Sequence, residues 1–87
     1  MVNAQEWLDR NYPKDQRKKI TNLDISKQNL YGSLKLDNFS NLEEFNCSNN
    51  QITSLDLTDC QKLEIIDGGF NYLTNLTLPV NNKIKSF

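Results

Sequence analysis

The chain has no histidine among its 87 residues, and it holds only two cysteines, three glycines and two prolines. Histidine is the commonest general base, so neither a Ser-His nor a Cys-His catalytic dyad can form within these residues. Two cysteines without histidine do not supply the ligands of a zinc site. A glycine-rich phosphate loop is also missing, because the only adjacent glycines are Gly68 and Gly69. We therefore predict a protein that is not an enzyme, with no catalytic residues, no metal site and no cofactor.

Long apolar runs and a marked excess of charge are missing as well. No stretch approaches the roughly 20 apolar residues that span a bilayer. Residues 1–10 lack the basic start and apolar run of a signal peptide. Ten basic and eleven acidic residues leave a formal net charge of −1, which gives no electrostatic preference for nucleic acid or acidic lipid. We therefore predict no nucleic-acid partner and no membrane partner.

What the chain does contain is a repeated spacing of apolar residues. Residues 42–63 read LEEFNCSNNQITSLDLTDCQKL, which fits the spacing L-x-x-L-x-L-x-x-N-x-L. The pattern recurs 21 residues later from Leu63 and 22 residues earlier from Ile20, and a further copy begins at Ile84. The first copy has one extra residue between Leu30 and Leu34. Gly32, which lies there, tolerates backbone angles that other residues avoid.

This spacing is the signature of a leucine-rich repeat, and the chain resembles asparagine-rich members of that family with repeats of about 21 residues. The resemblance implies an α/β repeat solenoid with parallel sheets, which binds other macromolecules but no particular ligand. Two positions depart from the pattern, since Gly68 replaces an inward apolar residue and Gln28 replaces the turn asparagine. The expected organisation is an N-terminal helical cap at 1–19, repeats at 20–41, 42–62 and 63–83, and the start of a fourth at 84–87.

The N-terminal segment does not repeat, and it is predicted to be helical. Asn3 and Glu6 have the spacing of a helix start, and Pro13 ends this helix near residue 11. A second short helical piece is expected at 14–19. Solenoids need their open ends covered, and we expect Trp7, Leu8 and Tyr12 to cover the first coil.

Half of the basic residues fall in this segment. Two interpretations are open: a basic patch for an anionic partner, or an ordinary solvated helix face. The residues concerned are Arg10, Lys14, Arg17, Lys18 and Lys19.

Each repeat is predicted to hold two short strands, in which apolar residues alternate with polar ones. The first set is 23–25, 45–47 and 66–68, and the second set is 34–36, 55–57 and 76–78. Stacking them gives two parallel sheets packed across a thin core. The inward-turned amides of Asn50 and Asn71 are expected to satisfy backbone groups where the chain turns, in their own and in neighbouring coils.

The two cysteines are predicted to be buried thiols without a disulfide. Cys47 is at an inward strand position, and Cys60 falls where Phe39 stands one repeat earlier. Buried free thiols fit a reducing compartment, which favours the cytoplasm.

The candidate binding surface is the outward side of the first set of strands. Acidic residues gather there, at Asp24, Glu43, Glu44, Glu64 and Asp67. Phe70 and Tyr72 allow two interpretations, either exposed hot spots or side chains packed on a neighbouring coil. The candidate partner-binding residues are Asp24, Glu44, Asn46, Ile65, Asp67, Phe70 and Tyr72.

The function expected from these features is a protein–protein interaction module without catalysis, which displays a concave parallel-sheet surface. The acidic surface favours a basic segment of a protein whose identity the sequence does not give. The alternative is a structural or assembly element, which self-associates through an open C-terminal edge or belongs to a longer array.

Overall fold

The computed structural model describes residues 1–80 and 83–86 of the chain. In this part, the short strand β1 (Val2–Asn3) leads into helix α1 (Ala4–Asn11) and the 3₁₀ helix η1 (Lys14–Lys19). The strands that follow are β2 (Asn22–Asp24), β3 (Leu30–Lys35), β4 (Glu44–Asn46), β5 (Gln51–Asp56), β6 (Ile65–Asp67) and β7 (Asn75–Thr77). None of the described helices is long and apolar enough to cross a membrane.

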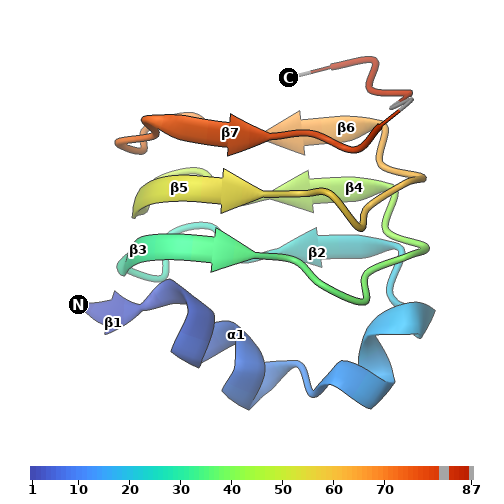
Figure 1. The fold of residues 1–87 in the computed structure, drawn as a ribbon. Helices are drawn as coiled ribbons and strands as arrows, with labels where there is room; N and C mark the ends of the chain where they lie inside the picture. Colours follow the sequence, from blue (N-terminus) through green and yellow to red (C-terminus); the bar gives the residue numbers. More distant parts are fainter. Residues whose placement is uncertain (81–82, 87) are drawn as a thin grey trace.

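The strands form two sheets in which every pairing is parallel. One sheet has the order β1-β3-β5-β7 and the other β2-β4-β6. Figure 1 shows the strands stacked in three levels: the first level holds β2 and β3, the second β4 and β5, and the third β6 and β7. The prediction of two parallel sheets with a short helix is confirmed. The strands β2, β4 and β6 begin and end one residue earlier than predicted, whereas β3 and β5 are longer.

The core lies between the two sheets, as the alternation of apolar and polar residues predicts. Leu23, Phe45 and Ile66 point inward from successive strands of one sheet and are buried. Leu34 and Leu55 do the same from the other sheet. The next residue in that column, Leu76, is 39% exposed because β7 is the last strand of its sheet.

The extra residue of the first repeat falls at an irregularity in the sheet. The register of β3 with β5 shifts between Gly32 and Ser33. Gly32 has a φ of +90°, a conformation that side chains with a Cβ rarely adopt. Gly68, by contrast, has room for a Cβ, which would lie 3.7 Å from Leu73 Cδ1. Its departure from the repeat pattern is therefore not required by the backbone.

The N-terminal segment lies across the first level (Figure 1). The Asn3 side chain accepts a hydrogen bond from the backbone N–H of Glu6 at 3.1 Å, which confirms the predicted helix start. Leu8 is buried in the core, and Trp7 and Tyr12 pack against it. Strand β1 was not predicted, because a two-residue strand carries no periodicity.

Arg17 is fully buried, so both interpretations of its charge were wrong. Its Nη1 and Nη2 contact the carboxylates of Asp37 and Asp9 at 2.8 Å each. Its Nε donates to the carbonyl of Tyr12 at 2.8 Å. The guanidinium carbon lies 5.1 Å from the centre of the Phe39 ring, within the range of a cation–π contact. Arg17 therefore joins the helical segment to the first level.

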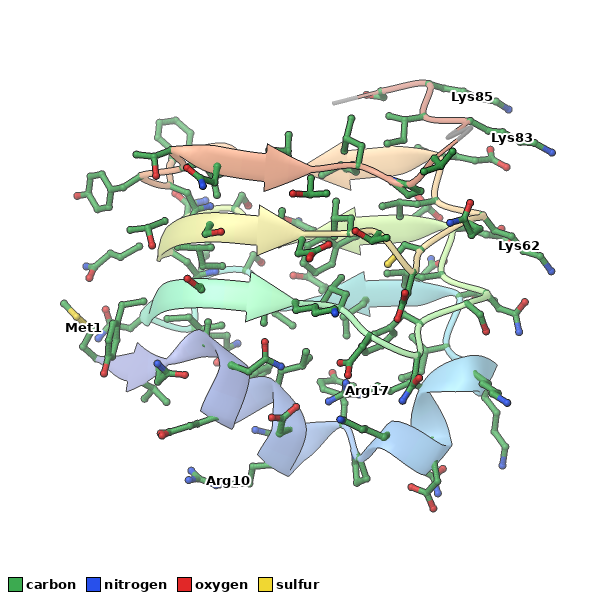
Figure 2. The ribbon with its side chains drawn as sticks, in the orientation of Figure 1. Met1, Arg10, Arg17, Lys62, Lys83 and Lys85 are labelled. Atoms are coloured by element: carbon green, nitrogen blue, oxygen red, sulfur yellow. The ribbon has the colours of Figure 1, made fainter. Side chains whose placement is uncertain are left out.

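The other residues of that basic group remain near water. Lys14 forms an ion pair with Asp37 at 3.2 Å, and Lys18 and Lys19 are exposed. Figure 2 shows Arg10 pointing away from the body, whereas Arg17 lies between the helical segment and the sheets.

The side-chain amide of Asn50 satisfies backbone groups in two levels, as predicted. Its Oδ1 accepts from the N–H groups of Gln28 at 3.1 Å and Leu30 at 3.0 Å. Its Nδ2 donates to the carbonyls of Ile25 and Cys47, each at 3.0 Å. One buried side chain thus ties the turn of the second level to that of the first.

Asn71 repeats this arrangement one level on. Its Oδ1 accepts from the N–H of Ile52 at 2.9 Å, and its Nδ2 donates to the carbonyl of Cys47 at 2.8 Å. Gln28, at the matching position of the first level, is exposed. The amide ladder therefore begins at the second level.

The last residues described run alongside β6. Ser86 pairs with Ile65, and the N–H of Ile66 donates to the carbonyl of Ser86 at 3.0 Å. The predicted fourth repeat begins in this stretch, but Phe87 lies outside the described residues, as do positions 81 and 82.

Both cysteines are buried free thiols, as predicted. Burial raises the pKa of Cys47 to about 12, and it raises that of Cys60 to the same value. Both groups are therefore protonated and unreactive at neutral pH.

Replacing Arg17 by methionine should lower the free energy of unfolding by about 2 kcal/mol, because it removes the hydrogen bonds of a fully buried guanidinium to two carboxylates and a backbone carbonyl. The measurement is urea unfolding followed by circular dichroism. Arg10→Met is the matched control, and it should change the stability by less than about 0.5 kcal/mol. Equal effects of the two substitutions would contradict the role given to Arg17.

Replacing Asn50 by alanine should lower the free energy of unfolding by about 3 kcal/mol, since several buried backbone groups lose their hydrogen-bond partner at once. Asn22→Ala, at an exposed strand position, serves as the control. Hydrogen exchange at the N–H groups of Gln28 and Leu30 should accelerate in N50A, and unchanged exchange there would contradict the assignment.

Candidate functional site

The candidate site is the outward side of sheet β2-β4-β6, called the outer face below. The strand register aligns its side chains in two columns, Asn22–Glu44–Ile65 and Asp24–Asn46–Asp67. The same residues line a shallow hollow of about 350 Å³. The structure thus brings together five of the seven predicted binding residues, namely Asp24, Glu44, Asn46, Ile65 and Asp67.

The second column also shapes the backbone. Asp24 Oδ1 accepts from the N–H of Ser26 at 2.9 Å and from its hydroxyl at 2.6 Å. Asn46 Oδ1 accepts from the same two groups of Ser48, at 2.9 and 2.8 Å. These are Asx turns, which end each strand and fix the side chain's orientation.

The third level has the same Asx turn, with one hydrogen bond fewer. Asp67 Oδ1 accepts from the N–H of Gly69 at 3.1 Å, and Gly69 has no hydroxyl to add. On the other sheet, Asp56 holds Thr58 in the same way through its N–H and its hydroxyl. The sequence analysis missed this role, although the spacing of Asp or Asn two residues before Ser, Thr or Gly signals it.

The Asx turns also set the charge state of the acidic residues. The hydrogen bonds from the Ser26 hydroxyl and backbone N–H lower the pKa of Asp24. The same bonds from Thr58 lower the pKa of Asp56. Both groups are therefore ionised at neutral pH, and Asp24 presents a negative charge on the outer face.

One of the predicted acidic residues is paired with a basic side chain. Glu64 forms an ion pair with Lys85 at 3.2 Å. Figure 2 shows Lys85 on the same side of the molecule as Lys62 and Lys83. The acidic character therefore rests on Asp24, Glu44 and Asp67 of the outer face and on Glu43 beside it.

Phe70 and Tyr72 lie in the loop that joins β6 to β7. Phe70 is 85% exposed and Tyr72 is 66% exposed, so the interpretation that they pack on a neighbouring level was wrong. Ile65, at the edge column of the outer face, is 41% exposed. The third level therefore carries three exposed apolar side chains close to Asp67 in the sequence.

The chemistry available to this site is that of carboxylates, amides and aromatic rings. Within residues 1–80 and 83–86, no three Cys, Asp or Glu side chains come together as metal ligands. Comparison with family models, with curated proteins and with solved structures finds no match to this chain.

Stability should fall when the pH drops below about 4, because Asp24 and Asp56 have lower pKa values in the folded than in the unfolded chain. Their contribution is complete above the unfolded pKa and is lost as the pH falls through the folded one. Ser26→Ala should reduce this acid dependence, because it removes the bond that most lowers the pKa of Asp24.

The measurement is the urea midpoint between pH 7 and pH 2.5, together with NMR titration of the Asp24 carboxyl. Ser40→Ala, at an exposed position, is the control. An Asp24 pKa that does not rise in S26A would show that the turn does not stabilise the ionised form.

Proposed function

We propose that the chain is a leucine-rich-repeat solenoid whose function is to bind another protein, without catalysis. Its aligned strands lie 22 and then 21 residues apart, at Leu23, Phe45 and Ile66, which supports the family assignment. The amide ladder of Asn50 and Asn71 supports it as well, because these are the asparagines of the repeat signature. In this proposal, residues 1–19 are the N-terminal cap of the solenoid.

The observation that carries the proposed function is the outer face itself. It combines acidic side chains, exposed apolar groups and a hollow of about 350 Å³ on a sheet whose three strands pair between successive levels. Asx turns hold two of its carboxylates in place, so little side-chain entropy is lost on binding. The charge of this face favours a partner that offers an extended basic segment.

The location that we propose for the protein is the cytoplasm. Cys47 and Cys60 are buried thiols without a disulfide, which is the usual state of cysteines in a reducing environment.

Binding should depend on the charge of the outer face. The full chain is immobilised and used to select from a displayed library of random 12-residue peptides, and basic peptides should be enriched. Asp24→Asn with Glu44→Gln should weaken their binding about tenfold, since each exposed ion pair contributes up to about 1 kcal/mol. The Asn at position 24 keeps the turn, because Asn46 makes the same turn in the second level.

Glu6→Gln with Asp15→Asn is the matched control, because it removes the same charge from the N-terminal segment. Failure of the native chain to enrich any peptide over the D24N/E44Q chain would overturn the proposed function.

One observation favours the alternative of self-association. All three residues of β7 are exposed, and Leu76, which pairs with the buried Leu55 of β5, is itself 39% exposed. A strand at the end of a sheet invites pairing with another chain. Light scattering over a concentration series separates the two functions, since a mass that rises with concentration favours assembly and a constant monomer mass favours the binding module.

A further inference from the structure

Equivalent positions of the three levels can be compared directly, and the third level differs from the other two at exposed positions. Phe70 stands where the earlier levels have Lys27 and Asn49. Ile65 stands where they have Asn22 and Glu44. Because these positions are exposed in every level, core packing does not require the apolar side chains of the third.

Phe70 occupies a backbone conformation that suits it poorly. The equivalent residues of the three levels all have positive φ, at 55° for Lys27, 59° for Asn49 and 58° for Phe70. Asparagine is favoured in this left-handed region, whereas a bulky side chain there is an outlier.

Neighbouring hydrogen bonds hold Phe70 in this conformation. The carbonyl of Gly69 accepts from the N–H of Asn49 at 2.9 Å, and Asn71 Nδ2 donates to the Gly68 carbonyl at 3.2 Å. One of these bonds links the third level to the second, and the other closes the turn around Phe70 within the third level. The ring is unfavourable twice, through backbone strain and through its exposure to water, because 85% of it is uncovered by the described residues.

Within the fold, one of the chain's own arginines contacts an aromatic ring and a carboxylate at the same time. Arg17 contacts the Asp37 carboxylate at 2.8 Å while its guanidinium lies 5.1 Å from the Phe39 ring centre. At the third level, the chain presents the same two groups to solvent, with the Asp67 carboxylate three residues before the Phe70 ring. Guanidinium is the group that fits both, because it pairs with carboxylates and stacks on aromatic faces.

We propose that Phe70 is the anchor of the binding surface, and that it takes an arginine of an extended basic segment in a partner protein. The guanidinium stacks on the Phe70 ring, and it pairs with Asp67. The neighbouring basic residues of the segment lie over Asp24 and Glu44. This inference rests on the proposed function and adds to it the residue and the partner side chain that give specificity.

The test uses the full chain with the basic 12-residue peptides selected on it. Phe70→Asn should weaken their binding about tenfold or more, as is usual for an aromatic hot spot. The same substitution should raise the thermal midpoint by about 4 °C, because asparagine relieves the left-handed strain. Phe70→Gly is the second variant, since glycine adopts this conformation freely. Tyr31→Gln removes an aromatic that is 42% exposed on the other sheet, and it should leave binding unchanged.

The arginine itself is tested by replacing it with lysine in each selected peptide. This change keeps the charge but removes the stacking group, so it should weaken binding to the native chain and have no effect on binding to F70N. Peptides that bind F70N as tightly as the native chain, yet bind D24N/E44Q weakly, would overturn this inference and leave the proposed function standing. A lowered thermal midpoint in both F70N and F70G would overturn the strain argument.

Discussion

The stacking of this molecule depends on side-chain amides that replace backbone partners where the chain turns between its sheets. Asn50 and Asn71 each bond to backbone groups of their own level and of the level before. Buried N–H and C=O groups without partners are costly, so the first and second levels are each stabilised by the following level, whose amide completes their turn. The stack is therefore built by nearest-neighbour contacts, as the proposed solenoid requires.

The first level has no preceding neighbour, and the N-terminal segment takes that place. Gln28 is exposed and supplies no amide, but the N–H of Val2 donates to the carbonyl of Asn29 at 3.0 Å as β1 joins the sheet. Arg17 completes the attachment, with its charge shared between the carboxylates of Asp9 and Asp37. The two ends therefore differ, because the first level is covered by α1 and η1 whereas Leu76 of the third remains partly exposed.

Features that depend on sequence-local periodicity could be predicted. Alternating apolar residues gave the strands, and an asparagine inside an apolar pattern indicated a buried, bonded amide. The burial of Arg17 could not be predicted, because its partner Asp37 lies 20 residues away and a lysine-rich run looks solvated. The Asx turns went unrecognised although their spacing is local. The exposure of Phe70 was left open, because the sequence does not show which side of a turn faces water.

Some side chains of the outer face and its adjoining turn could be replaced without changing the backbone, so the fold alone does not explain them. The turns need only an acceptor oxygen at positions 24, 46 and 67, which Asp24 and Asn46 supply equally well. The negative charges at Asp24 and Asp67 are thus not required by the turn. In the same way, the left-handed position accepts Lys27 and Asn49, so the aromatic ring of Phe70 is not required either. Charge and ring both exceed what the backbone needs, and both face solvent, as the proposed binding of a partner requires.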